Sequence, residues 1–105
     1  MNKERRIAIA RIVKDLGVEI ENAKTIRGDL LEKQSEIGKL RSIESRVLDS
    51  LEEKWSETSR YESCEEALDK LTDATDNMRQ LLSILQQFED KVGEIIDDLE
   101  NATFC

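Results

Sequence analysis

A pattern of apolar residues between Tyr61 and Leu99 constrains the fold of this chain more than any other feature. When the residues are numbered in sevens, one column reads Cys64, Leu71, Met78, Leu85, Val92 and Leu99, and the column four residues further on reads Leu68, Thr75, Leu82, Glu89 and Ile96. Two such columns, sustained over about five heptads, predict a long α-helix that packs lengthwise on other helices.

A third column widens this apolar stripe. It comprises Ala67, Ala74, Leu81, Phe88 and Ile95. A stripe of three columns is wider than a two-stranded coiled coil requires, and it favours a bundle of three or four helices. The residues that we expect to form the core or an oligomer seam are Leu68, Leu71, Met78, Leu82, Leu85, Phe88, Val92, Ile96 and Leu99.

The first half of the chain also has a helical period, which Asn2 is placed to cap. One heptad column contains Leu16, Ala23, Leu30 and Ile37, and the other contains Ile12, Ile26, Leu40 and Val47. Polar residues also fall in these columns, namely Glu19, Lys33, Glu44 and Lys54. Because the columns keep their phase across Gly28, we expect one helix over about residues 3–57.

The next segment, Ser56-Glu57-Thr58-Ser59-Arg60, predicts a turn at about residues 56–60, followed by a helix over about residues 60–100. We therefore expect an all-α fold with a single helical domain over residues 1–105. In it, a long antiparallel helical hairpin forms a coiled-coil-like four-helix bundle as a homodimer. The alternative is a break at Gly28, followed by an N-cap at Asp29, which would give a monomeric three-helix bundle.

The composition argues against catalysis. Among its 105 residues the chain has no His, so it lacks the usual base at neutral pH. It has neither a glycine-rich phosphate loop nor a Cys/His cluster with metal-ligand spacing. We therefore expect a protein that is not an enzyme and that has no cofactor or metal.

Cysteine usage and hydropathy indicate a compartment. Cys64 falls in the apolar seam, where a free thiol behaves as a small hydrophobe, and Cys105 is the last residue. Two cysteines do not make a disulfide framework. No secretory segment and no run of 18 apolar residues is present, so we expect no contact with membranes and a cytoplasmic location.

The net charge of −8 is unevenly distributed. Residues 1–60 contain 13 basic and 12 acidic residues, whereas residues 61–105 contain 3 and 12. The acidic charge of residues 61–105 argues against direct binding to nucleic acid, because such binding depends on neutralising phosphates. The acidic residues form two neighbouring outward columns, which we call the acidic face: Glu66, Asp69, Asp73, Asp76, Asp90, Glu94 and Asp97.

The acidic face has two interpretations. It is either a solvated outer surface or a row of charges that resembles nucleic-acid phosphates and binds the basic groove of another protein. Three residues beside the predicted turn, Trp55, Arg60 and Tyr61, are a second candidate surface, because Trp, Tyr and Arg are enriched where proteins bind one another. Alternatively, Trp55 and Tyr61 close the end of the bundle.

Two parts of the sequence carry a resemblance. The opening Met-Asn-Lys-Glu-Arg-Arg resembles the start of a group of small, uncharacterised helical proteins encoded by bacteriophages and prophages. The stretch from Asp49 to Leu71 resembles the second half of that group, mainly through Glu65, Ala67, Leu68, Asp69 and Leu71. This chain lacks the Pro and the loop glycines of that group. The resemblance implies a phage setting, and a location in the cytoplasm of a bacterial host.

These observations lead to two main functional hypotheses, beside a third possibility, which is nucleic-acid binding through the basic N-terminus. The first is a non-enzymatic phage accessory protein that binds another protein, in particular an inhibitor of a host nucleic-acid-binding or defence protein of the anti-restriction or anti-CRISPR type. The phage setting makes this an argument by association. The second is a structural or assembly protein that uses its helices only to form an oligomer and has no host target.

Overall fold

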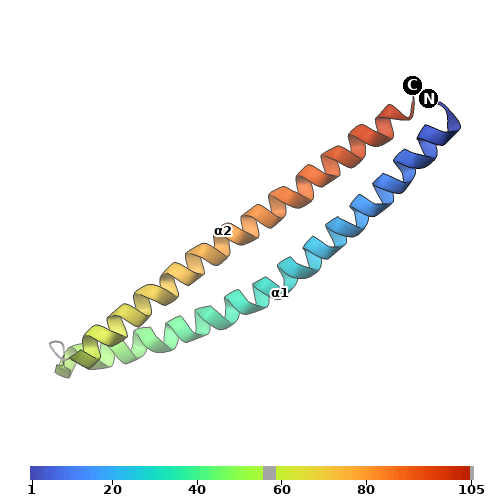
Figure 1. The fold of residues 1–105 in the computed structure, drawn as a ribbon. Helices are drawn as coiled ribbons and strands as arrows, with labels where there is room; N and C mark the ends of the chain where they lie inside the picture. Colours follow the sequence, from blue (N-terminus) through green and yellow to red (C-terminus); the bar gives the residue numbers. More distant parts are fainter. Residues whose placement is uncertain (56–58, 105) are drawn as a thin grey trace. The chain divides into compact units, whose positions relative to one another are not determined.

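The computed structural model describes residues 1–55 and 59–104, and for residues 52–55 it describes the backbone only. This part of the chain forms two α-helices, α1 (Lys3–Trp55) and α2 (Ser59–Ala102), and contains no strand (Figure 1). The predicted all-α class is confirmed for these residues. The predicted turn includes residues 56–58, which lie outside the described residues, as does Cys105.

Helix α1 is continuous through Gly28, so the alternative with a break at this residue is wrong. A Cβ atom added at Gly28 would meet no atom within 4 Å, and no described residue other than glycine has a positive φ, nor has any described glycine. The backbone therefore has an ordinary helical conformation at this position. A glycine inside a helix costs about 1 kcal/mol relative to alanine, which a helix of this length tolerates.

The start of α1 is capped as predicted. Asn2 Oδ1 accepts a hydrogen bond from the backbone N–H of Arg5 at 2.9 Å, and the carbonyl of Asn2 accepts one from the N–H of Arg6 at 3.1 Å. A side-chain acceptor at this position pairs one of the amides that a helix leaves unpaired in its first turn.

The chain divides into two compact units. Unit 1 comprises Met1–Asp29 and Leu82–Cys105, and unit 2 comprises Leu30–Leu81. Within each unit, a segment of α1 lies beside a segment of α2 and runs in the opposite direction (Figure 1). The single domain over residues 1–105 stays a prediction.

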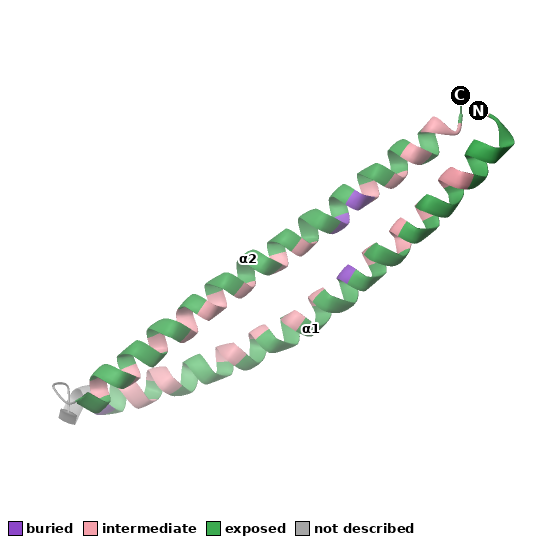
Figure 2. Ribbon diagram, in the orientation of Figure 1, coloured by how far each residue is buried: buried purple, intermediate pink, exposed green. Residues whose placement is uncertain are grey.

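On α2, all residues of the two predicted columns are buried or half-buried (Figure 2). Phe88, which we expected among the core or oligomer-seam residues, is 44% exposed within the single chain. It lies one position before Glu89 and therefore outside both columns. The third column does not face α1 within the chain.

On α1, the burial corrects one of the two predicted columns. The residues facing α2 form two columns. The Leu16 column is buried or half-buried, and in the other column Arg41 is exposed whereas Val13, Ile20, Arg27, Gln34 and Leu48 are half-buried. The predicted partner column was wrong by one residue, since Ile12, Ile26 and Leu40 are exposed. Periodicity alone selected the more apolar of two adjacent columns.

The resulting core is small. Among the described residues, the buried apolar side chains are Ala23, Leu51 and Val92, and no large side chain is fully buried. Two helices that meet along one seam can bury only a narrow stripe of each helix, and most side chains in the seam stay partly in contact with solvent.

Candidate protein-binding surfaces

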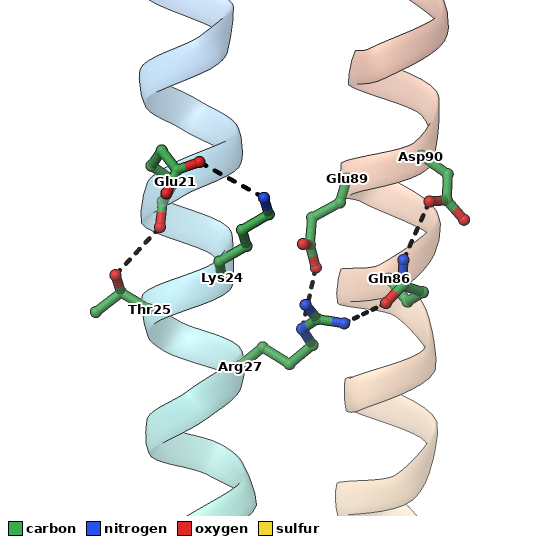
Figure 3. Close-up of polar contacts among 7 residues, drawn as sticks. All are labelled: Glu21, Lys24, Thr25, Arg27, Gln86, Glu89 and Asp90. Carbon is green, nitrogen blue, oxygen red and sulfur yellow. Dashed lines mark hydrogen bonds and ion pairs between the residues drawn. The ribbon is translucent and has the colours of Figure 1, made fainter.

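The seam of unit 1 contains a charged pair, Arg27 of α1 and Glu89 of α2 (Figure 3). Arg27 Nε lies 3.2 Å from Glu89 Oε2, and the side chain of Glu89 is 6% exposed, compared with 31% for Arg27. Glu89 Oε2 makes no hydrogen bond among the described residues, so the contact is an ion pair without hydrogen-bond geometry. A buried carboxylate is tolerated when a cation lies this close.

The side-chain amide of Gln86 extends this contact toward the surface. Arg27 Nη1 donates a hydrogen bond to Gln86 Oε1, and Gln86 Nε2 donates one to Asp90 Oδ1 at 3.0 Å (Figure 3). The guanidinium therefore connects a buried charge to the surface, and its long aliphatic stem can pack in the seam. This explains why an arginine occupies a column of α1 that faces α2. The sequence signal was the matching polar residue, Glu89, in a seam column of α2.

Unit 2 has one polar side. Arg41 Nε donates a hydrogen bond to Thr72 Oγ1 at 3.0 Å, and Thr72 Oγ1 donates one to the carbonyl of Leu68 at 3.0 Å. The open groove on this side is lined by Arg41, Ser42, Ser45, Arg46, Leu68, Asp69 and Thr72. Charged and hydroxyl groups thus dominate one side of the seam.

The other side of unit 2 is apolar. A groove of about 530 Å³ lies there, lined by Leu40, Glu44, Arg60, Ser63, Cys64, Ala67, Lys70 and Leu71. Leu40 belongs to α1 and Ala67 to α2, and each residue comes one position before a seam column. The residues that precede the seam columns on the two helices therefore lie on the same side of this unit.

We call these two rows the flank columns. On α1 the flank column is Ile12, Glu19, Ile26, Lys33, Leu40 and Val47, and on α2 it is Ala67, Ala74, Leu81, Phe88 and Ile95. Six of their large apolar members are between 42% and 53% exposed, and the seventh, Val47, is half-buried. The six exposed residues are Ile12, Ile26, Leu40, Leu81, Phe88 and Ile95. Scattered exposed apolar residues are normal, but a row at heptad spacing marks a face that another helix can cover.

The seven residues of the acidic face are all exposed on α2. Asp76 lies 3.5 Å from Arg79 Nη1, and Glu94 lies 2.8 Å from Lys91 Nζ, both as exposed pairs within the helix. Asp69 follows the seam residue Leu68 and Ala67 precedes it. At about 100° per residue, the column of Asp69 therefore points to the side of the seam opposite the flank column. The column of Glu66, Asp73 and Glu94 points away from the seam, about 100° from the flank column.

The carboxylate of Glu94 changes the ionisation of Lys91. The pKa of Lys91 is raised, mainly because its ammonium donates a hydrogen bond to the Glu94 carboxylate and secondly through the charge of that carboxylate. Desolvation opposes the shift, and Asp98 adds to it. Since the lysine is fully exposed, this is a local surface effect.

The second candidate surface is only partly described. Arg60 is exposed and lines the apolar groove of unit 2, and Tyr61 is half-buried. The side chain of Trp55 lies outside the described residues. The structure therefore does not bring the three residues together as a described cluster.

Chemical groups for other kinds of site are limited. The described residues contain no group of three or more His, Cys, Asp or Glu side chains that could hold a metal ion. No helix in the described part of the chain is long and apolar enough to cross a membrane. The arrangement offers three kinds of surface: the acidic face, an apolar groove and a polar groove.

The comparisons with known proteins add no relative. No family model, no curated protein and no solved structure matches this chain.

Proposed function

We propose that this chain is a non-enzymatic protein-binding module that acts as a homodimer, in which the helices form a coiled-coil-like four-helix bundle. The observation that supports the proposal is the division of α2 into three faces: a seam toward α1, an exposed apolar flank column and an exposed acidic face. A helix that served only to pair with α1 would need the seam alone.

The acidic face is the proposed surface for a partner protein. Its residues are exposed and point away from the seam, about 100° or more from the flank column around the helix, so they stay accessible if the flank column is covered. A row of carboxylates attracts a basic groove, and proteins that bind nucleic acids have such grooves. The proposed partner is therefore a nucleic-acid-binding or defence protein of a bacterial host, and the chain is a phage accessory protein in the host cytoplasm.

The experiment is a capture from bacterial lysate with the wild-type chain and with the variant Asp69→Asn/Asp73→Asn/Asp76→Asn. The matched control is Asp29→Asn/Glu32→Gln/Glu36→Gln, which removes the same charge from exposed positions of α1. We expect a basic protein to be captured by the wild type and the control but not by the acidic-face variant. Raising the salt concentration should release it, because exposed charges are screened.

A competitor identifies the class of partner. Short duplex DNA should displace the captured protein if the acidic face occupies its nucleic-acid groove. Capture that is equal for the two variants would contradict a role for the acidic face.

The second candidate function is assembly alone, and the exposed flank columns are the observation that favours it. A chain that only assembles would form the same oligomer with all three sequences and would capture no basic protein. The two functions therefore differ in the capture experiment and agree in the oligomeric state.

A further inference from the structure

We infer that the α1 flank column is the surface on which a second copy of this chain packs, with the two α1 helices antiparallel and Ile26 at the two-fold axis. This deepens the homodimer proposed above and does not depend on the acidic-face partner. The inference specifies the face, the orientation and the register of the two copies.

The chain leaves a large area exposed. Its accessible surface is 7878 Å², whereas a compact monomer of 12.1 kDa exposes about 6,000 Å². The difference, about 1,900 Å², exceeds the roughly 800 Å² that each partner buries in an interface of standard size. A second copy would therefore find enough surface for a stable dimer.

The order of residues in the α1 flank column suits a two-fold axis. Read outward from Ile26, the neighbours are Glu19 on one side and Lys33 on the other, and the next residues are Ile12 and Leu40. A two-fold axis requires that if residue i contacts residue j of the partner, then j contacts i. With Ile26 on the axis, Glu19 lies opposite Lys33 of the second copy, and Ile12 lies opposite Leu40.

This register pairs unlike charges and like apolar groups. Glu19 and Lys33 are both exposed, and Lys33 has only a weak contact within its own helix, at 3.5 Å from Glu36. A shift by one heptad would place Lys33 opposite Ile26 and leave both charges without a partner of opposite sign. The charges thus select one register among those that the apolar residues allow.

The acidic face disfavours other ways of pairing. Two copies that met through α2 by the acidic face would bring like charges together, which is unfavourable. The flank column of α1 contains one acid and one base, and it carries no net charge. It is the face on which a second copy meets no repulsion.

The test is chemical cross-linking at the predicted axis. In a background with Cys64→Ala and Cys105→Ser, the variant Ile26→Cys is compared with Val18→Cys, which has similar exposure on the outer side of α1. With a short bis-maleimide, Ile26→Cys should form a covalent dimer at least about tenfold faster, because the effective concentration of two thiols held together is of millimolar order. Light scattering of the wild type gives the mass in parallel.

A charge exchange provides an independent readout. Glu19→Lys should weaken the dimer in sedimentation experiments, and adding Lys33→Glu should restore it, while circular dichroism shows unchanged helix content. A wild type with the mass of one chain would overturn both the homodimer and this inference. A wild-type dimer in which Ile26→Cys reacts no faster than Val18→Cys, or in which the charge exchange fails to restore binding, would overturn this inference alone.

Discussion

Replacing Arg27 and Glu89, the charged pair in the seam of unit 1, tests whether the arginine compensates a buried carboxylate. We compare Arg27→Leu, Glu89→Leu and the double variant. Arg27→Leu leaves the carboxylate of Glu89, which is 6% exposed, without its cation. Glu89→Leu leaves Arg27, whose side chain is 31% exposed and can turn its guanidinium to water. The two single variants should therefore differ.

The magnitudes follow from the burial of each partner. Removing one member of a fully buried pair costs about 3–5 kcal/mol. Because the arginine is partly exposed, we expect about 2–3 kcal/mol for Arg27→Leu and about 1 kcal/mol for Glu89→Leu. The double variant replaces both charges by apolar groups in the seam, and it should be as stable as the wild type or more stable by about 1 kcal/mol or more.

The assay is urea unfolding followed by far-ultraviolet circular dichroism. All variants are measured at one chain concentration, since the stability of an oligomer depends on concentration. Hydrogen exchange then assigns the loss to the amides of unit 1. Equal losses for the two single variants, or a double variant less stable than both, would refute the reasoning that Glu89 is the buried charge and Arg27 its compensation.

Three further predictions concern local contacts. Gly28→Ala should raise the free energy of unfolding by about 1 kcal/mol in the same assay, because the position is helical and a Cβ meets no atom within 4 Å; a loss would contradict the unbroken α1. Asn2→Ala should lower the free energy of unfolding by about 1 kcal/mol, because the N-cap of α1 is lost. Hydrogen exchange should show fraying of the first turn of α1. Glu94→Gln should lower the pKa of Lys91 in an NMR titration. Since that pKa is raised, the contact stabilises the folded chain at pH values below the ordinary lysine pKa of about 10.5, and this stabilisation is lost as the pH rises through the raised pKa. An unchanged lysine pKa in Glu94→Gln would contradict the contact.

The sequence predicted α2 better than α1, and the reason is the strength of the apolar signal. The two seam columns of α2 contain mostly aliphatic residues, so the heptad period assigned them without ambiguity. On α1, Ile12 and Ile26 are more apolar than Arg27 and Gln34, although the latter face α2. Periodicity measures hydrophobicity and does not see that Glu89, far away in the sequence, compensates Arg27.

Two other features show the same limit. Gly28-Asp29 has the local chemistry of a helix end, yet α1 continues, because pairing along the helix outweighs a local cost of about 1 kcal/mol. Phe88 belongs to the apolar stripe of α2 but not to its seam. The width of a stripe predicts how many helices it can contact, and a single chain with two helices covers only part of it.

The most direct test of the central claim is hydroxyl-radical footprinting of the wild type over a range of chain concentrations. The claim is that the apolar flank columns are covered by a second copy while the acidic face stays open. Phe104, which is 85% exposed, serves as an internal reference for Phe88, because the two rings react alike. We predict that oxidation of Phe88 and Ile26 relative to Phe104 falls as the concentration rises. Oxidation ratios that stay constant at all concentrations, with the mass of one chain, would contradict the account.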